Sequence, residues 1–96
     1  MEMIKEYRKL INEIDFKLIE NIKARSLIVQ SIGKIKLDKK INIMQEDRVS
    51  ELLRERKEVA EKLQIDQDFI EDIFKLIVLY SCKLEKDIFE AGMKSE

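Results

Sequence analysis

The stretch EMIKEYRKLINEIDFKLIENIKARSLIVQSIGKIKL, residues 2–37, decides the fold of this chain. Apolar residues recur in it at heptad spacing in two columns, and this period predicts one long amphipathic helix. The columns are Ile4, Ile11, Leu18 and Ile32, and Tyr7, Ile14, Ile28 and Ile35. At ~1.5 Å per residue such a helix is roughly 50 Å long, far longer than the core of a small globule. We therefore expect it to lie against another molecule, most simply a second copy of the chain.

Two further helices are expected after this one. Residues 38–42 interrupt the apolar pattern and indicate a loop. A second helix is expected over about 45–63, with one face made of Leu52, Arg56 or Val59, and Leu63. A third helix follows Asp66, a candidate N-cap, and ends near Met93. The chain has no proline and only two glycines, which is typical of long helices with few turns. We expect a single all-α domain over residues 1–96.

The composition excludes several classes of function. A net charge of −1 argues against nucleic-acid or membrane-surface binding driven by bulk charge. We expect no membrane span and no secretion signal, since no sufficiently long apolar run occurs. Histidine is absent and Cys82 is the only cysteine, so neither a zinc site nor a serine or cysteine triad can be assembled. We expect no cofactor, and the lone Cys82 suits a reducing cytoplasm.

Polar residues interrupt the apolar columns of the first helix. Arg25 stands in one column and Asn21 in the other, and a buried charge is costly unless it is paired or faces a polar cavity. Lys36 lies eleven residues after Arg25, or about 20° beyond three full turns, so both project from nearly the same face. This spacing leaves open whether Arg25 lines a pocket or forms a structural ion pair.

Arg8 cannot share a pocket with Arg25 of its own chain if the helix is straight. The seventeen residues between them place Arg8 about 100° around the helix and roughly 25 Å along it. In an antiparallel or crossed dimer, Arg8 could instead reach the pocket of the partner. Later in the chain, Ser81 and Glu85 form an i,i+4 pair beside an apolar face, and Arg48 opens the second helix.

Taken together, these residues resemble the all-helical chorismate mutase family, the AroQ type. The resemblance covers nearly the whole chain: Tyr7 to Asp15 with its R-x6-D spacing, Arg25 to Lys36, Asp47-Arg48, and Asp66 to Ile77. The ordered series Arg8, Arg25, Lys36 and Arg48, with spacings of 17, 11 and 12 residues, is its most specific part.

The resemblance implies an intertwined homodimer of three-helix chains that rearranges chorismate to prephenate in the shikimate pathway of aromatic amino acid biosynthesis. Each of its two sites would take Arg8 from the other protomer, and Arg8 and Arg25 would grip the substrate carboxylates beside Arg48. Lys36 would hydrogen-bond a carboxylate and the ether oxygen whose bond breaks. Ser81 would lie near a carboxylate, and the apolar wall would consist of Ile32, Val78 and Cys82.

Three positions depart from the family pattern. Gln45 stands where many members have aspartate, and Val49 where many have a glutamate that contacts the ring hydroxyl of the substrate. Glu85 replaces a glutamine that donates to the ether oxygen, and an ionised carboxylate has no proton to donate. We therefore expect that Glu85 must be protonated for turnover, that activity falls as pH rises, and that Glu85→Gln flattens this decline.

These departures leave alternatives open. Arginine followed by valine at positions 48 and 49 is similar to the isochorismate pyruvate lyase branch, which yields salicylate and pyruvate. We favour the mutase over this lyase, and both over a mutase of the 4-amino analogue of chorismate. The non-enzymatic alternative is a helical dimerisation or regulatory module that keeps the fold but not the chemistry.

Overall fold

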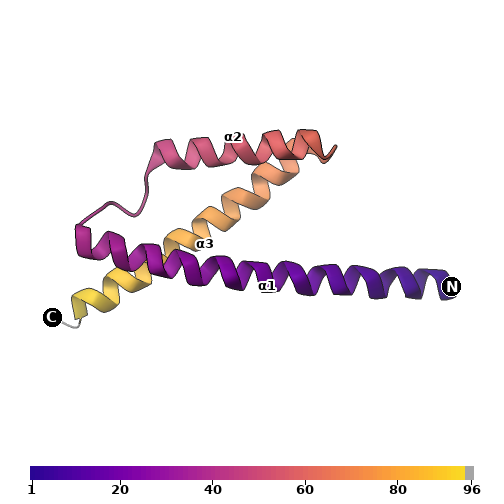
Figure 1. Cartoon of the computed structure of the whole chain (residues 1–96), viewed down its shortest axis with the longest axis horizontal. Helices are drawn as coiled ribbons and strands as arrows, with labels where there is room; N and C mark the ends of the chain where they lie inside the picture. Colours follow the sequence, from indigo (N-terminus) through magenta and orange to yellow (C-terminus); the bar gives the residue numbers. More distant parts are fainter. Residues whose placement is uncertain (95–96) are drawn as a thin grey trace.

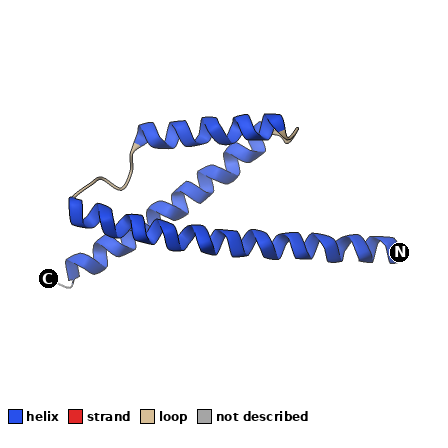
Figure 2. Cartoon of the chain, in the orientation of Figure 1, coloured by secondary structure: helices blue, strands red, loops and turns tan. Residues whose placement is uncertain are grey.

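The computed structural model describes residues 1–94 and contains three helices, α1 (Glu2–Lys39), α2 (Glu46–Lys62) and α3 (Gln67–Lys94) (Figures 1 and 2). No strand occurs in this part of the chain. The predicted all-α class with three helices per chain is therefore confirmed.

The first connection begins later than predicted, since Asp38 and Lys39 still belong to α1. The helix ends where Lys40 adopts the left-handed conformation at φ 57° and ψ 44°. The N–H of Ile41 then donates to the carbonyl of Lys36 at 2.9 Å, which satisfies an otherwise unpaired carbonyl of the last turn. The end of α1 is thus set by one backbone conformation and not by a change in side-chain polarity.

The turn between α2 and α3 is compact and capped on both sides. Gln64 has a φ of 59°, and the N–H of Ile65 donates to the carbonyl of Ala60 at 2.9 Å. The N–H of Phe69 donates to the Asp66 carboxylate at 3.0 Å, which confirms Asp66 as the N-cap of α3.

Both α1 and α2 pack against α3, which crosses α1, and the directions of α1 and α2 are opposite (Figure 1). In the described chain no Cα atom of α1 comes within 8 Å of one of α2. The buried apolar residues are few: Val29, Leu52, Ala60 and Val78. The region between α1 and α2 is therefore bounded by three helices but filled by little of this chain.

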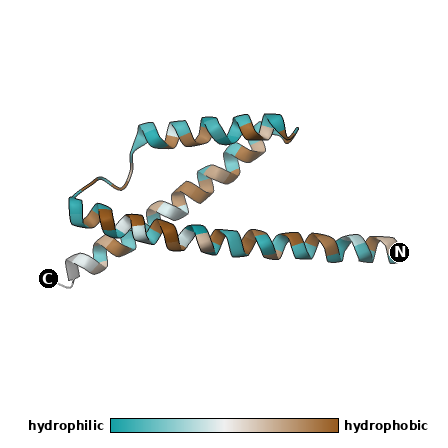
Figure 3. Ribbon diagram, viewed as in Figure 1, coloured by the Kyte–Doolittle hydropathy of each residue, from teal (hydrophilic) through white to brown (hydrophobic). Residues whose placement is uncertain are grey.

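The N-terminal end of α1 extends beyond the other two helices, and the whole N-terminal half of this helix is exposed (Figure 1). Its apolar residues, which continue along the helix in Figure 3, remain exposed by 45–63%: Ile4, Tyr7, Leu10, Ile11, Ile14, Phe16, Leu18, Ile19 and Ile22. The Cα radius of gyration is 17.3 Å, whereas a compact chain of this length has about 12–13 Å. No described helix is both long and apolar enough to cross a membrane.

Candidate active site

A cavity of about 320 Å³ lies where α1, α2, α3 and the first connection meet. This volume falls in the range of small-molecule sites. Of the site residues predicted from the sequence, the structure places all except Arg8 in its wall: Arg25, Ile32 and Lys36 from α1, Gln45 from the connection, Arg48 and Val49 from α2, and Val78, Ser81, Cys82 and Glu85 from α3.

Arg25 and Ser81 face each other across the contact between α1 and α3. The Arg25 guanidinium donates a hydrogen bond to the Ser81 hydroxyl, which in turn donates to the carbonyl of Ile77 at 2.9 Å. Burial, and to a lesser extent the charge of nearby Arg56, lowers the pKa of Arg25 below its usual value. Arg25 has no carboxylate partner within residues 1–94, so of its two readings, pocket residue and structural ion pair, the structure supports the pocket.

Lys36 is held by two acceptors at the other end of the cavity. Its ammonium nitrogen lies 3.2 Å from each carboxylate oxygen of Glu85 and donates to the carbonyl of Ile43 at 2.9 Å. The Lys36 and Glu85 side chains are only 14% and 7% exposed. An ammonium has three donors, so these two partners fix the direction of the third. In the ligand-free chain Glu85 is thus the counter-ion of Lys36.

Gly33 allows α1 and α3 to approach closely at this ion pair. A Cβ at position 33 would lie 3.2 Å from Ile88 Cδ1, 3.3 Å from Glu85 Cγ and 3.4 Å from Glu85 Cα. The two nearest of these atoms belong to side chains of α3, which would have to shift slightly to admit a side chain at position 33. Gly33 therefore helps to set the separation of Lys36 and Glu85.

The start of α2 supplies the remaining polar wall. Arg48 lines the cavity and makes no ion pair within the described chain. Gln45 and Val49 stand beside it, so these two departures from the family pattern, like the third at Glu85, face the cavity. The sequence analysis missed four apolar wall residues: Val29, Ile43, Met44 and Leu52. Val29 and Leu52 follow from helical spacing, but Ile43 and Met44 belong to the connection between α1 and α2, where no periodic pattern predicts the direction of a side chain.

Arg8 does not line this cavity, in agreement with the helical geometry. It lies on the exposed N-terminal half of α1. Within residues 1–94 no three Asp, Glu, Cys or His side chains come together in a group that could hold a metal ion.

Comparison with known proteins agrees with the resemblance inferred from the sequence. The model of the family described as chorismate mutase type II matches residues 7–86. The T-protein of Haemophilus influenzae is 33% identical over 75 residues, which is 78% of this chain but 20% of that protein. The chain therefore spans about a fifth of the length of this curated relative. Since the family match includes most of all three helices and every wall residue of the cavity, the chain belongs to the chorismate mutase type II family.

Proposed function

We propose that this protein is a chorismate mutase that converts chorismate to prephenate without a covalent intermediate. The observation that carries the proposal is the charge of the cavity, where Arg25, Lys36 and Arg48 face a single carboxylate, that of Glu85. This excess of positive charge favours an anionic ligand such as a dicarboxylate. Guanidinium groups bind carboxylates through paired hydrogen bonds, so Arg25 and Arg48 are the groups that grip the substrate.

Lys36 is the group proposed to act on the reacting bond. The rearrangement breaks the ether C–O bond and forms a C–C bond in one step, so no group leaves and no proton is transferred. As the ether bond lengthens, its oxygen gains negative charge, which an ammonium stabilises more in the transition state than in the ground state. The ion pair with Glu85 and the carbonyl of Ile43 hold that ammonium in place before substrate arrives.

Glu85 is proposed to be protonated when substrate is bound. A neutral Glu85 has an O–H to donate to the ether oxygen. Turnover is therefore expected to fall as pH rises.

A second copy of the chain is proposed to complete the site. The exposed apolar residues of α1 need cover, and Arg8 lies roughly 25 Å along the helix from Arg25 of its own chain. A symmetric dimer with antiparallel α1 helices would place Arg8 of each copy beside Arg25 of the other. Arg8→Ala and Arg25→Ala should each be nearly inactive, and a mixture should regain up to one intact site per heterodimer. If confirmed subunit exchange restores no activity, the shared site is wrong.

Isochorismate pyruvate lyase is the second candidate because Val49 lines the cavity where many mutases have glutamate. Valine cannot accept a hydrogen bond from a ring hydroxyl, so recognition of the 4-hydroxyl of chorismate is weakened. The deciding experiment compares kcat/KM of the purified protein on chorismate and on isochorismate. A mutase has the larger value on chorismate and forms prephenate, whereas a lyase releases salicylate and pyruvate. The 4-amino analogue of chorismate, the least favoured substrate, is included in the same comparison.

A non-catalytic helical module is the remaining alternative. A true site must stabilise the folded protein when a dicarboxylate transition-state mimic is added, by an amount that grows with its concentration. Unchanged thermal stability at millimolar mimic, with no turnover of any of these substrates, would favour the module.

The mutase proposal also includes a single domain over residues 1–96 and a cytoplasmic location. The free thiol of Cys82 in the cavity wall suits a reducing compartment.

A further inference from the structure

Asp15 is an acidic residue in an apolar surface. It is exposed on α1 and has no ion pair within residues 1–94. By helical spacing it lies among Ile11, Leu18 and Ile22, which are 54%, 55% and 45% exposed. Any molecule that covers these isoleucine and leucine side chains also covers the carboxylate. That molecule must then supply a cation, because an unpaired buried charge is costly.

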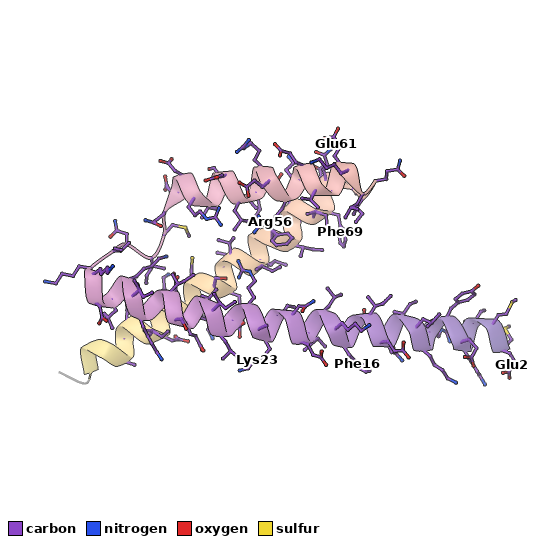
Figure 4. All side chains as sticks on the ribbon, in the orientation of Figure 1. Glu2, Phe16, Lys23, Arg56, Glu61 and Phe69 are labelled. Atoms are coloured by element: carbon purple, nitrogen blue, oxygen red, sulfur yellow. The ribbon has the colours of Figure 1, made fainter. Side chains whose placement is uncertain are left out.

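Arg56 is a cation with little compensation on the inner side of α2. Its guanidinium carbon lies 5.6 Å from the centre of the Phe74 ring, and its side chain is only 33% exposed. Its nearest carboxylate is that of its chain neighbour Glu55, at 3.4 Å and partly in solvent. Figure 4 shows Arg56 on the side of α2 that faces α1, whereas Glu61 lies on the opposite side. Arg56 therefore lies on the side of α2 that faces α1, packed over Phe74 of α3 and still a third exposed.

We propose that Arg56 forms an ion pair with Asp15 of a second copy of this chain, twice in each symmetric dimer. The inference rests on the shared site proposed above, in which Arg8 of the second copy reaches the cavity. It adds the contact that sets the register of the two chains along α1. The partner is identified by charge and spacing.

The direction of the helices brings the two residues together. In a two-fold symmetric dimer with Arg8 beside Arg25 of the other copy, the α1 helices are antiparallel. Since α2 also runs opposite to α1, α2 is roughly parallel to the α1 of the second copy (Figure 1). From Arg8 to Asp15 the second copy advances seven residues, about 10 Å, with a change of direction of about 20°. From Arg48 at the cavity to Arg56, α2 advances eight residues, about 12 Å.

No other acidic residue of α1 fits this position. The carboxylates of Glu2, Glu6, Glu13, Glu20 and Asp38 project at least about 120° away from Arg8 around the helix, whereas Asp15 lies within about 20° of it. If Arg8 points into the cavity of the other copy, only Asp15 points to the same side. The R-x6-D spacing noted in the sequence thereby acquires a structural role for its second member.

Charge reversal tests the pair independently of turnover. The dimer dissociation constants of Asp15→Arg, Arg56→Asp and the double variant are measured by sedimentation over a dilution series. Each single reversal places like charges together at two positions per dimer, so we expect dissociation to increase by about 30-fold or more. The double variant restores opposite charges and should return to within about fivefold of the parent. Circular dichroism checks that each variant remains helical. If a charge reversal prevents folding, the same comparison of single and double variants is made with Asp15→Asn and Arg56→Gln, which remove the charges without reversing them.

Arg54 provides the matched control, since it lies two residues from Arg56 on the same helix but is 66% exposed and paired with Glu58 at 3.6 Å. Arg54→Asp should neither weaken the dimer appreciably nor rescue Asp15→Arg. Additive single effects, with no rescue in the double variant, would overturn the pair. Mixing Arg8→Ala with Arg25→Ala separates this result from a failure of the proposed function. If the mixture regains activity but the effects of the substitutions at positions 15 and 56 on dimer dissociation are additive, the ion pair alone is refuted.

Discussion

The replacement Glu85→Gln should have opposite effects on stability and on activity at high pH. In the ligand-free chain Glu85 is 5% exposed and both of its oxygens lie 3.2 Å from the Lys36 ammonium. Removing one partner of a buried ion pair costs about 3–5 kcal/mol. Glutamine keeps one oxygen that can accept from Lys36, and the carbonyl of Ile43 remains at 2.9 Å, so we expect a smaller loss of about 1–2 kcal/mol. For a chain of this size that lowers Tm by roughly 5–15 °C.

The same replacement should preserve turnover where the parent loses it. A glutamine amide donates to the ether oxygen at any pH, whereas Glu85 does so only when protonated. Initial rates of chorismate consumption are measured from about pH 5 to about pH 9, at saturating and at limiting substrate. The parent should decline toward high pH, and the variant should be nearly flat across the range.

The matched control is Glu58→Gln on the exposed side of α2, where the carboxylate pairs with Arg54 at 3.6 Å. Exposed pairs of this kind contribute little, so we expect a stability change below about 0.5 kcal/mol and an unchanged pH–rate profile. Thermal unfolding is followed at one fixed protein concentration because dimerisation makes Tm depend on concentration. Parallel pH–rate curves for the parent and Glu85→Gln would exclude Glu85 as a hydrogen-bond donor to the ether oxygen, and an unchanged Tm would refute the account of the ion pair.

Three further predictions follow from the described geometry. Gly33→Ala gains about 1 kcal/mol of helix propensity but crowds the side chains of Ile88 and Glu85, so we expect net destabilisation of about 1 kcal/mol in urea unfolding and about tenfold lower kcat/KM. A stabilised, fully active variant would contradict the close approach. Glu71 pairs with Lys57 and Lys75, and these two ammonium groups lower the pKa of the Glu71 carboxyl to about 2. The contribution of Glu71 to folding stability is therefore present above about pH 4.5 and is lost as pH falls toward 2. Glu71→Gln should weaken the loss of Tm over that interval, and an acid profile identical to the parent would exclude this pair as its source. Arg25→Lys replaces the planar guanidinium, which can form two parallel hydrogen bonds to a carboxylate, so kcat/KM should fall about 100-fold with little change in Tm. A loss of kcat/KM below fivefold would argue against such paired contacts.

Much of the fold could be predicted because it depends on local periodicity. The heptad columns predict α1, and the side-chain cap at Asp66 predicts where α3 begins. The end of α1 was predicted two residues too early because Lys40 terminates it in a left-handed conformation that glycine or asparagine usually adopts. A lysine gives no such indication in a sequence, and the charged run at residues 38–40 is as compatible with a last helical turn as with a loop.

The candidate site was predictable only in part from spacing. Helical geometry places Arg25 and Lys36 on one face of α1 and Ser81 and Glu85 on one face of α3. It cannot place one face against the other, since the hydrogen bonds between them join residues 56 and 49 positions apart. The family resemblance supplied that pairing. Neither source suggested that Arg56 would lie half-buried over an aromatic ring and close enough to Arg25 to lower its pKa.

The division of charges in the cavity suggests why the connection after α1 belongs to the site. Arg25 and Arg48 have no carboxylate partner in the described chain and are available for a ligand, whereas Lys36 is already bound by Glu85 and Ile43. An ammonium that must stabilise charge only as a bond breaks is most effective when its direction is set beforehand. One of the two groups that set it is the carbonyl of Ile43, whose position depends on the left-handed turn at Lys40. The connection, predicted from the sequence only as a loop over residues 38–42, therefore contributes at Ile43 a carbonyl that orients the group on which the proposed chemistry depends.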